Sequence, residues 1–361
     1  MTKEYDLIFI GAGLSSLMFL NQYLKKFKNH TVLILERKKE IEKDQTFCVW
    51  EGPGLDSIQN NFNLKPKKIW DKIHVQNSHE KVIRDINPYK YVCFDGHNTL
   101  KKLMNEHADQ VNIKNDVEVK NIEKKDHIFI VKSKDKFFKG KFVVDSRHDF
   151  AKKNIKSCYV NQAFVGHEIQ TNKNEFTPDQ VTLMSFSNKS KEIEFTYILP
   201  FSARRALVET TVFSKKPNMT SIKNTQKNLL KTFEIKNVIR TEQGVIPMAI
   251  IKNNSYKDEI LKIGTSVGMV RPSSGYSMRR IASWLLGIKM VKLNNKSYKS
   301  YYYKHNRIIN WLDSIFLKVI YYYPNKGSDL FLCLFRKANM PSLIRFLSDH
   351  TSTIDLIKIL W

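Results

Sequence analysis

Residues 5–16 read Tyr-Asp-Leu-Ile-Phe-Ile-Gly-Ala-Gly-Leu-Ser-Ser, an apolar run of strand length that stops abruptly at a glycine turn. Apolar residues at helical spacing follow, and residues 31–35 then form a second strand-like run, closed by Glu36. This order of strand, glycine turn, helix, strand and acid predicts the first unit of a Rossmann-type dinucleotide-binding domain.

Each residue of the turn has an expected role in binding a dinucleotide. Gly11 and Gly13 would let the backbone come close to a pyrophosphate. The helix that begins at Leu14 and Ser15 offers free N–H groups and the positive end of its dipole. Ser16 occupies the third glycine position of the usual fingerprint, so we expect the helix and the strand to lie slightly further apart. The alternative is a plain strand–helix–strand unit that binds no cofactor.

Glu36 stands where a Rossmann domain places the acid that accepts hydrogen bonds from a ribose. This position favours a cofactor with a free ribose 2′-hydroxyl over one with a 2′-phosphate. The neighbouring Arg37 weakens that preference.

The composition indicates a globular protein. The chain has 361 residues, of which 42% are hydrophobic, so it can bury a large core. Its 4 cysteines are scattered, without the spacing of a zinc or redox site, and we expect no metal. No apolar run reaches the roughly 20 residues that span a bilayer, and the N-terminus does not resemble a signal peptide. We therefore expect a cytoplasmic protein.

The formal net charge of +25 has two possible explanations. It could serve a polyanionic partner, either a nucleic acid or an anionic membrane surface. It could also reflect a proteome rich in lysine, asparagine and isoleucine. The lysines are spread along the chain, which argues against a dedicated nucleic-acid-binding arm.

The order of strands and helices predicts an α/β fold with interleaved domains. We expect the nucleotide-binding domain to be built from residues 1–60, 95–158 and 240–292. We expect a β-sheet substrate domain to be built from residues 61–94 and 159–239. Residues 293–361 look helical and aromatic. Such interleaving is typical of FAD-binding flavoproteins and not of simple NAD dehydrogenases.

Two other segments are expected near the cofactor. Residues 44–54 are rich in aromatic residues and glycine, and are predicted to form a loop of the kind that covers a flavin. The apolar strand at 142–144 ends at Asp145 and would return the chain to the nucleotide-binding domain. The alternative for Asp145 is a surface position at a strand end.

A second glycine-rich turn spans residues 264–277 and precedes a helix. Its N–H groups would hold the pyrimidine end of a flavin. The residues expected to take part are Gly264, Gly268, Pro272, Gly275 and Tyr276. The alternative is a helix capped by Ser273 or Ser274. Arg271 would be a flavin or phosphate contact or, more cautiously, a surface cation.

Glu209 is the candidate catalytic residue. In a strand over residues 205–213 it shares a face with Leu207, Thr211 and Phe213, and neither face is solvent-like. Burial would raise the pKa of the carboxyl and keep it protonated, as is needed to protonate a weak base such as an alkene. The alternative is an edge-strand glutamate paired with Arg204 or Arg205.

Four stretches resemble the flavin-dependent lycopene cyclases of plants and bacteria. They are Gly268-Met-Val-Arg-Pro-Ser-Ser-Gly-Tyr276, Leu207-Val-Glu-Thr-Thr211, Gln243-Gly-Val-Ile-Pro-Met248 and Leu330-Phe-Leu-Cys-Leu-Phe-Arg336. The resemblance runs from residue 5 to about residue 350. The combination is specific, although no single stretch is.

The resemblance implies a reaction without net redox change on a flavin scaffold. Relatives convert the linear ends of lycopene into β-rings, using reduced FAD, with NADPH as the usual reductant. The terminal double bond is protonated, the cation attacks the next double bond, and loss of a proton forms the ring alkene. By resemblance, Glu209 would be the acid–base residue, and lycopene and related carotenoids would be the substrates.

Three positions depart from the family pattern, one of them Ser16, which replaces a small residue in the first glycine turn. The family has a second acid where this chain has Thr210, which puts any role for two carboxylates in doubt. The family histidine is replaced by Arg271. The residues leave open whether β-, ε- or γ-rings form, and whether one or both ends are cyclised.

A carotenoid substrate implies contact with a membrane surface. An apolar helical face is formed by Ile308, Ile309, Trp311, Leu312, Ile315, Phe316, Val319, Ile320 and Tyr321. Tyrosines and basic residues flank it, as in an interfacial helix. The alternative is an ordinary buried helix. Two other functions also remain open: a redox flavoenzyme of the same fold, such as a hydroxylase or prenyl-chain reductase, and a basic flavoprotein that acts on RNA.

Overall fold

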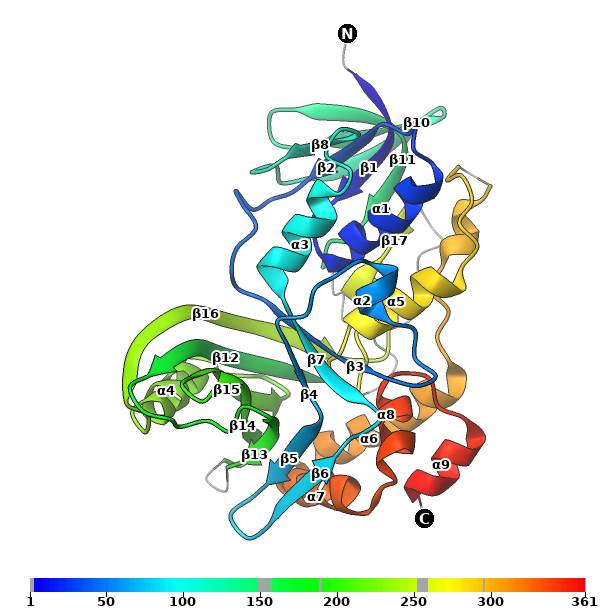
Figure 1. Ribbon diagram of the computed structural model, residues 1–361. Helices are drawn as coiled ribbons and strands as arrows, with labels where there is room; N and C mark the ends of the chain where they lie inside the picture. The colour runs from blue at the N-terminus through cyan, green and yellow to red at the C-terminus, as the bar shows by residue number, and fades with distance from the viewer. Residues whose placement is uncertain are drawn as a thin grey trace.

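The computed structural model describes residues 3–148, 155, 158–187, 190–251, 259–294 and 296–360. Figure 1 shows a mainly parallel sheet near the N-terminus, a mainly antiparallel sheet below it in this view, and a group of helices at the C-terminal end. The chain passes repeatedly between the two sheets. The cavity described below therefore receives residues from distant parts of the sequence.

The first sheet has seven strands, and its central strands are parallel. Its strands are β8 (Val111–Lys114), β2 (Val32–Leu35), β1 (Glu4–Ile10), β11 (Phe137–Asp145), β10 (Ile128–Lys132) and β9 (Asn121–Lys125), with β17 (Leu261–Lys262) beside β11. All four residues of β2 are buried, as expected of a parallel strand covered on both faces. Helices α1 (Leu14–Lys26) and α3 (Gly96–Asn105) pack together beside this sheet.

The second sheet also has seven strands and carries the opposite wall of the cavity. In spatial order they are β16 (Ile235–Met248), β12 (Val160–Thr171), β15 (Arg205–Ser214), β14 (Ile193–Ser202), β13 (Gln180–Phe186), β5 (Lys72–Gln76) and β6 (Lys81–Asp85). Helix α4 (Met219–Leu230) packs against β12 and β15. The expected domain boundary at 239/240 falls inside β16.

A small third sheet connects the two halves. It consists of β3 (Thr46–Glu51), β7 (Lys90–Asp95) and β4 (Lys68–Trp70), with the short helix α2 (Ile58–Asn61) after β3. The predicted loop at 44–54 is therefore wrong over most of its length, because residues 46–51 form a strand. Its partner β7 follows some forty residues later, and such long-range pairing leaves no local pattern in the sequence.

The C-terminal region is helical, as expected. Its helices are α5 (Met278–Gly287), α6 (Arg307–Tyr322), α7 (Gly327–Lys337), α8 (Met340–Leu347) and α9 (Thr353–Leu360), with short 3-10 turns at Gly264–Val267, Tyr298–Tyr301 and Pro324–Lys326. Helix α7 packs against β5 and β6, so this region shares a hydrophobic core with the antiparallel sheet. Within the described chain, no helix combines the length and apolarity needed to cross a bilayer.

Candidate active site

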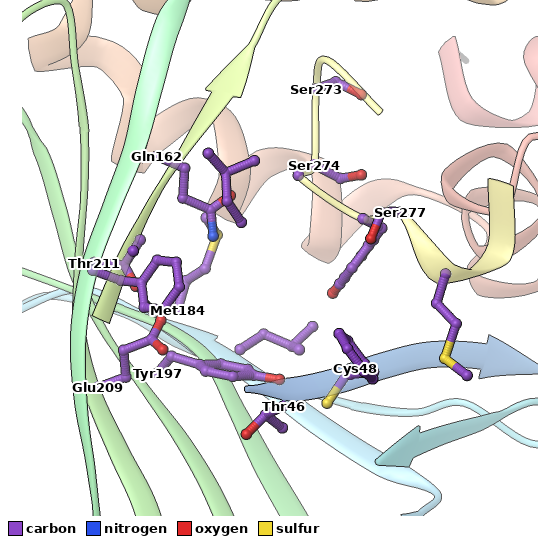
Figure 2. A pocket seen from close by; sticks show the side chains of 18 of the residues that line it. Thr46, Cys48, Gln162, Met184, Tyr197, Glu209, Thr211, Ser273, Ser274 and Ser277 are labelled. Carbon is purple, nitrogen blue, oxygen red and sulfur yellow. The ribbon is translucent and has the colours of Figure 1, made fainter. Parts of the chain in front are cut away.

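A cavity of about 540 Å³ lies where the two sheets and the C-terminal helices meet. Both glycine turns reach it, through Gly13 and Leu14 and through Ser273–Met278. Strand β3 and the antiparallel sheet form other parts of the wall. The antiparallel sheet contributes Phe164, Phe195 and Phe213 to this wall, and the C-terminal helices contribute Phe316, Phe331, Phe335 and Phe346. Figure 2 shows Glu209 and Thr211 on one side of this cavity, and Ser273, Ser274 and Ser277 across from them.

The first glycine turn is open toward the cavity. Gly11 has φ +92°, and a Cβ there would lie 2.6 Å from Ser146 Oγ, so the turn requires glycine. A Cβ at Gly13 would meet no atom within 4 Å. Gly13 is also the N-cap of α1, and no side chain caps that helix. The N–H groups of the first helical turn therefore remain available to an anionic group.

Glu36 lies beside the first glycine turn. Its Oε2 accepts a hydrogen bond from Ala12 N at 2.7 Å, and its Oε1 accepts one from Lys38 N at 2.9 Å. The carboxylate is thus held against the glycine turn at the end of β2. Arg37, the next residue, is exposed.

Asp145 ends β11 beside the first glycine turn. It is 5% exposed and forms an ion pair with Arg147 at 2.8 Å, so the alternative of a surface aspartate is wrong. The next residue, Ser146, donates a hydrogen bond to Ile10 O at 2.9 Å. Asp145 thus lies at the edge of the sheet where β1 turns into α1, but it does not itself line the cavity.

The second glycine turn packs directly against the first. A Cβ on Gly264 would lie 2.7 Å from Ser15 Oγ, and a Cβ on Gly275 would collide with Gln162 Oε1. Of the residues expected to contact a cofactor, Gly275 and Tyr276 line the cavity. Gly264, Gly268 and Pro272 do not.

The N-terminus of α5 also opens onto the cavity. Its N-cap is Ser277, and no side chain caps the helix, so capping by Ser273 or Ser274 is wrong. Ser273 Oγ instead accepts a hydrogen bond from Arg271 Nε at 3.0 Å, and the buried Ser274 Oγ has no partner among the described atoms. Two uncapped helix N-termini, those of α1 and α5, therefore face one cavity.

Arg271 is not a surface cation, and it does not line the cavity. It is 1% exposed, and its guanidinium pairs with Asp313 of α6 at 3.1 Å and with Asp349 at 3.6 Å. It also stacks on the ring of Phe346, with its Cζ 4.3 Å from the ring centroid. Arg271 therefore binds the second glycine turn to the C-terminal helices.

Glu209 lies in the middle of β15 and faces the cavity together with Thr211 and Phe213, as its strand pattern predicts. It is 7% exposed, and its Oε1 accepts a hydrogen bond from Thr211 Oγ1 at 2.5 Å. The edge-strand alternative is wrong because β15 lies between β12 and β14, and Arg205 pairs with Glu168 instead. Burial raises the pKa of Glu209 well above its ordinary value, and the charge of Glu242 raises it further.

Several cavity residues were not found from the sequence. Glu242 of β16 is hydrogen-bonded to Glu209, and its closeness in sequence to the Gln243–Met248 stretch was the available signal. Tyr91 bonds through its hydroxyl to the hydroxyls of Tyr197 and Tyr276, each at 2.9 Å. These three tyrosines come from the small sheet, the antiparallel sheet and the second glycine turn.

Residues 6–361 match the sequence pattern of the family described as "Lycopene cyclase protein". The chain belongs to the lycopene cyclase family. The resemblance found in the sequence is thereby confirmed. No curated protein sequence matches the chain.

Solved structures show the same fold at low identity. A geranylgeranyl bacteriochlorophyll reductase-like protein from Thermoplasma acidophilum is 12% identical, with a TM-score of 0.69 over 99% of this chain and 96% of that one. HpxO from Klebsiella pneumoniae, complexed with FAD, is 12% identical, with a TM-score of 0.64 over 99% and 100%. A flavoprotein/dehydrogenase from Cytophaga hutchinsonii is 13% identical, with a TM-score of 0.58 over 99% of each chain.

These likenesses confirm the predicted fold class, a Rossmann-type α/β domain interleaved with a β-sheet domain and followed by helices. Together with the family match they support an enzyme. Among the described residues, no group of three or more His, Cys, Asp or Glu side chains could hold a metal ion.

Proposed function

We propose that this member of the lycopene cyclase family is an FAD-dependent lycopene β-cyclase. It would convert the linear ends of lycopene to β-rings, giving β-carotene by way of γ-carotene, without net redox change. The observation that carries the proposal is a buried, protonatable carboxyl, Glu209, that faces an aromatic cavity onto which two uncapped helix N-termini also open.

The residues present fit FAD. The N–H groups after Gly13 would bind the pyrophosphate, and Glu36 is held where a ribose would lie. The N-terminus of α5 and the unpartnered Ser274 hydroxyl would hold the polar edge of the flavin. FAD reduced by NADPH would supply negative charge that stabilises a carbon cation in the cavity.

The side chains of this chain would supply the proton transfers. Burial and the charge of Glu242 raise the pKa of Glu209 well above its ordinary value, which favours the protonated carboxyl. It donates that proton to the terminal double bond. Its carboxylate is then in place to take one back when the ring alkene forms, so the product is an isomer of the substrate. The phenylalanine walls exclude water, which would otherwise capture the cation.

The test is expression in a bacterium that accumulates lycopene, with pigments separated by chromatography. The wild-type chain is expected to yield β-carotene. Glu209→Gln removes the proton donor but keeps the side-chain volume. It is expected to retain FAD and to lower product by at least about 100-fold, the usual scale of acid catalysis. Glu40→Gln, a change at an exposed glutamate, is the matched control.

Three outcomes would contradict the proposal. Undiminished β-carotene from Glu209→Gln would remove Glu209 from the mechanism. If the strain that expresses the wild-type protein still contains only lycopene, although the protein binds FAD, the cyclase function is excluded. Consumption of one NADPH per product molecule would instead indicate a redox flavoenzyme.

We also propose that the enzyme docks on a membrane surface through α6. Residues on the inner side of this helix, Asp313 and Phe316, line the cavity. Its outer side exposes Ile308, Trp311, Ile315 and Tyr322, at 59%, 62%, 42% and 61%. The apolar face expected from the sequence is therefore divided, because Ile309 and Ile320 point into the core. A carotenoid leaving a bilayer beside α6 would be one helix away from the cavity.

A further inference from the structure

Glu209 and Glu242 meet across a strand that has a glycine between them. Gly166 of β12 pairs with Glu209 of β15 on one side and with Glu242 of β16 on the other. Strands that flank a third strand lie about 9–10 Å apart, so their side chains are normally separated by the side chain of the middle residue. A Cβ on Gly166 would lie 3.3 Å from Glu209 Cβ and 3.2 Å from Glu242 Cγ. Glycine leaves that space free, and the two carboxyl groups are hydrogen-bonded to each other.

The two carboxyls have different surroundings. Glu242 is 4% exposed, and its Oε2 accepts hydrogen bonds from Arg240 at 2.6 Å and from Thr46 Oγ1 at 2.7 Å. Arg240 is held in turn by Glu168, at 2.7 Å. These contacts give the carboxyl of Glu242 a cationic partner and a hydroxyl donor. In the described chain, Glu209 is hydrogen-bonded to Thr211 and Glu242 and has no ion pair with a cation.

Glu242 also borders a second, polar cavity of about 610 Å³ on the other side of the sheet. His167, Lys223 and Lys227 line that cavity, together with Asp44. Asp44, Glu242 and Gln243 line both cavities. Glu242 thus lies between the apolar cavity and a polar space that water can enter.

We propose that Glu242 is the ionised partner of Glu209, that the two carboxyls share one proton across Gly166, and that Glu242 keeps this proton on Glu209 for the proposed cyclisation. Glu242 is therefore a positioning residue for the proton donor, and the polar cavity is the route by which the pair exchanges its proton with water. This inference rests on the proposed function for its catalytic meaning, but the shared proton can be tested without it.

The pairing of Glu209 with Glu242 also bears on Thr210, which stands where the family has a second acid. The side chain of Thr210 hydrogen-bonds to Gln226 of α4 at 2.7 Å, on the face of β15 away from the cavity. An acid at that position would not reach the same space. The second carboxyl comes instead from a different strand, thirty-three residues later (242 − 209 = 33).

The test is an infrared titration of protonated carboxyl groups in the FAD-loaded protein without carotenoid. Other titratable or charged groups around Glu209 are Cys48 of β3, Tyr197 of β14 and Arg240 of β16, with Asp44 at the cavity wall. The wild-type protein is expected to show a protonated carboxyl band that persists above neutral pH and is absent in Glu209→Gln. In Glu242→Gln, the pH midpoint of that band is expected to fall by about one unit or more, because a neighbouring negative charge is gone.

Two further variants sharpen the result. Gly166→Ala keeps both carboxyls but forces them apart, so it is expected to lower the midpoint as Glu242→Gln does, and it remains informative if Glu242→Gln folds poorly. Glu194→Gln changes a half-buried glutamate of β14 that does not line the cavity, and is expected to leave the midpoint unchanged. A midpoint that stays at the wild-type value in both Glu242→Gln and Gly166→Ala would overturn the proposal.

Activity gives a separate readout. The alkaline limb of the kcat–pH profile is expected to move to lower pH by the same amount in Glu242→Gln, which lowers kcat about tenfold per unit on the alkaline side. A displaced infrared midpoint with an unmoved alkaline limb would show that the pair shares a proton but does not serve the reaction. If the infrared midpoint is displaced in Glu242→Gln but the wild-type protein cyclises no lycopene, the shared proton is supported and the proposed function is rejected.

Discussion

At the scale of single residues, the position of Glu209 was predictable and its environment was not. Alternation along β15 was enough to place its side chain beside Thr211 and Phe213. The strands on either side of β15, and hence Gly166 and Glu242, depend on pairing between distant segments, which the sequence does not reveal. Arg271 was misread for the same reason, because its carboxylate partners follow 42 and 78 residues later (313 − 271 = 42; 349 − 271 = 78).

The buried carboxyl makes a prediction about stability. The pKa of Glu209 is raised in the folded protein, so between the ordinary value of 4.5 and the folded value the native state holds a proton that the unfolded chain has lost. Stability therefore falls as pH rises through this range. Glu209→Gln removes this loss, and its unfolding free energy relative to wild type is expected to rise by about 1.4 kcal/mol per pH unit above pH 4.5.

Chemical denaturation of the two proteins at several pH values measures this difference. Glu40→Gln, at an exposed position, is expected to show no such slope. A constant difference between Glu209→Gln and wild type from pH 5 to pH 8 would mean that the native carboxyl is ionised, contrary to the assigned protonation.

At the scale of elements, the units formed by local contacts were predicted well. The β1–α1–β2 unit follows from an apolar run, two glycines and helical spacing over some thirty residues. The loop predicted where β3 lies was wrong, because Phe47, Cys48 and Val49 form a strand only through their pairing with β7. Helix α6 was predicted with its apolar residues, but which of them face outward depends on how the helix packs against the rest of the molecule.

The outer side of α6 carries the prediction about membranes. Trp311→Glu places a charge in the middle of its exposed apolar stripe, and is expected to reduce sedimentation with vesicles of anionic phospholipid by about tenfold. Trp311→Phe keeps the surface apolar and is the control. Equal sedimentation of both variants and the wild type would exclude α6 as the docking surface. The same experiment at high salt separates the apolar contribution from that of the net charge of +25.

At the scale of the whole molecule, the second glycine turn is tied to the C-terminal helices by buried ion pairs. Arg271 and Arg280 share Asp313 and Asp349, and Arg280 also donates to the carbonyls of Gly268 and Val270. The sequence placed the turn and the helices separately but gave no sign that one anchors the other. The shape of the cavity therefore depends on segments that follow the turn by up to 78 residues (349 − 271 = 78).

Arg271→Met is expected to show this dependence. It leaves Asp313 and Asp349 buried with one cation fewer, a change that costs about 3–5 kcal/mol when a buried pair is broken. A lower Tm and weaker retention of FAD are expected together, because the turn that lines the cavity loses its anchor. Lys72→Met, which breaks the exposed pair with Asp179, is expected to change stability by less than about 1 kcal/mol. A Tm for Arg271→Met equal to that of Lys72→Met would contradict the anchoring role.

The hydroxyl groups of Tyr91, Tyr197 and Tyr276 carry more hydrogens than the hydrogen bonds between them use. Burial raises the pKa of Tyr91, Tyr197 and Tyr276, so each phenol keeps its hydrogen. Three hydroxyls own three hydrogens, but the two bonds that link them use only two. Whichever way the chain of donors runs, one O–H is left over. A molecule entering the cavity thus meets a third hydroxyl hydrogen on Tyr276 when the donors run one way, and on Tyr197, where Cys48 competes for it, when they run the other way.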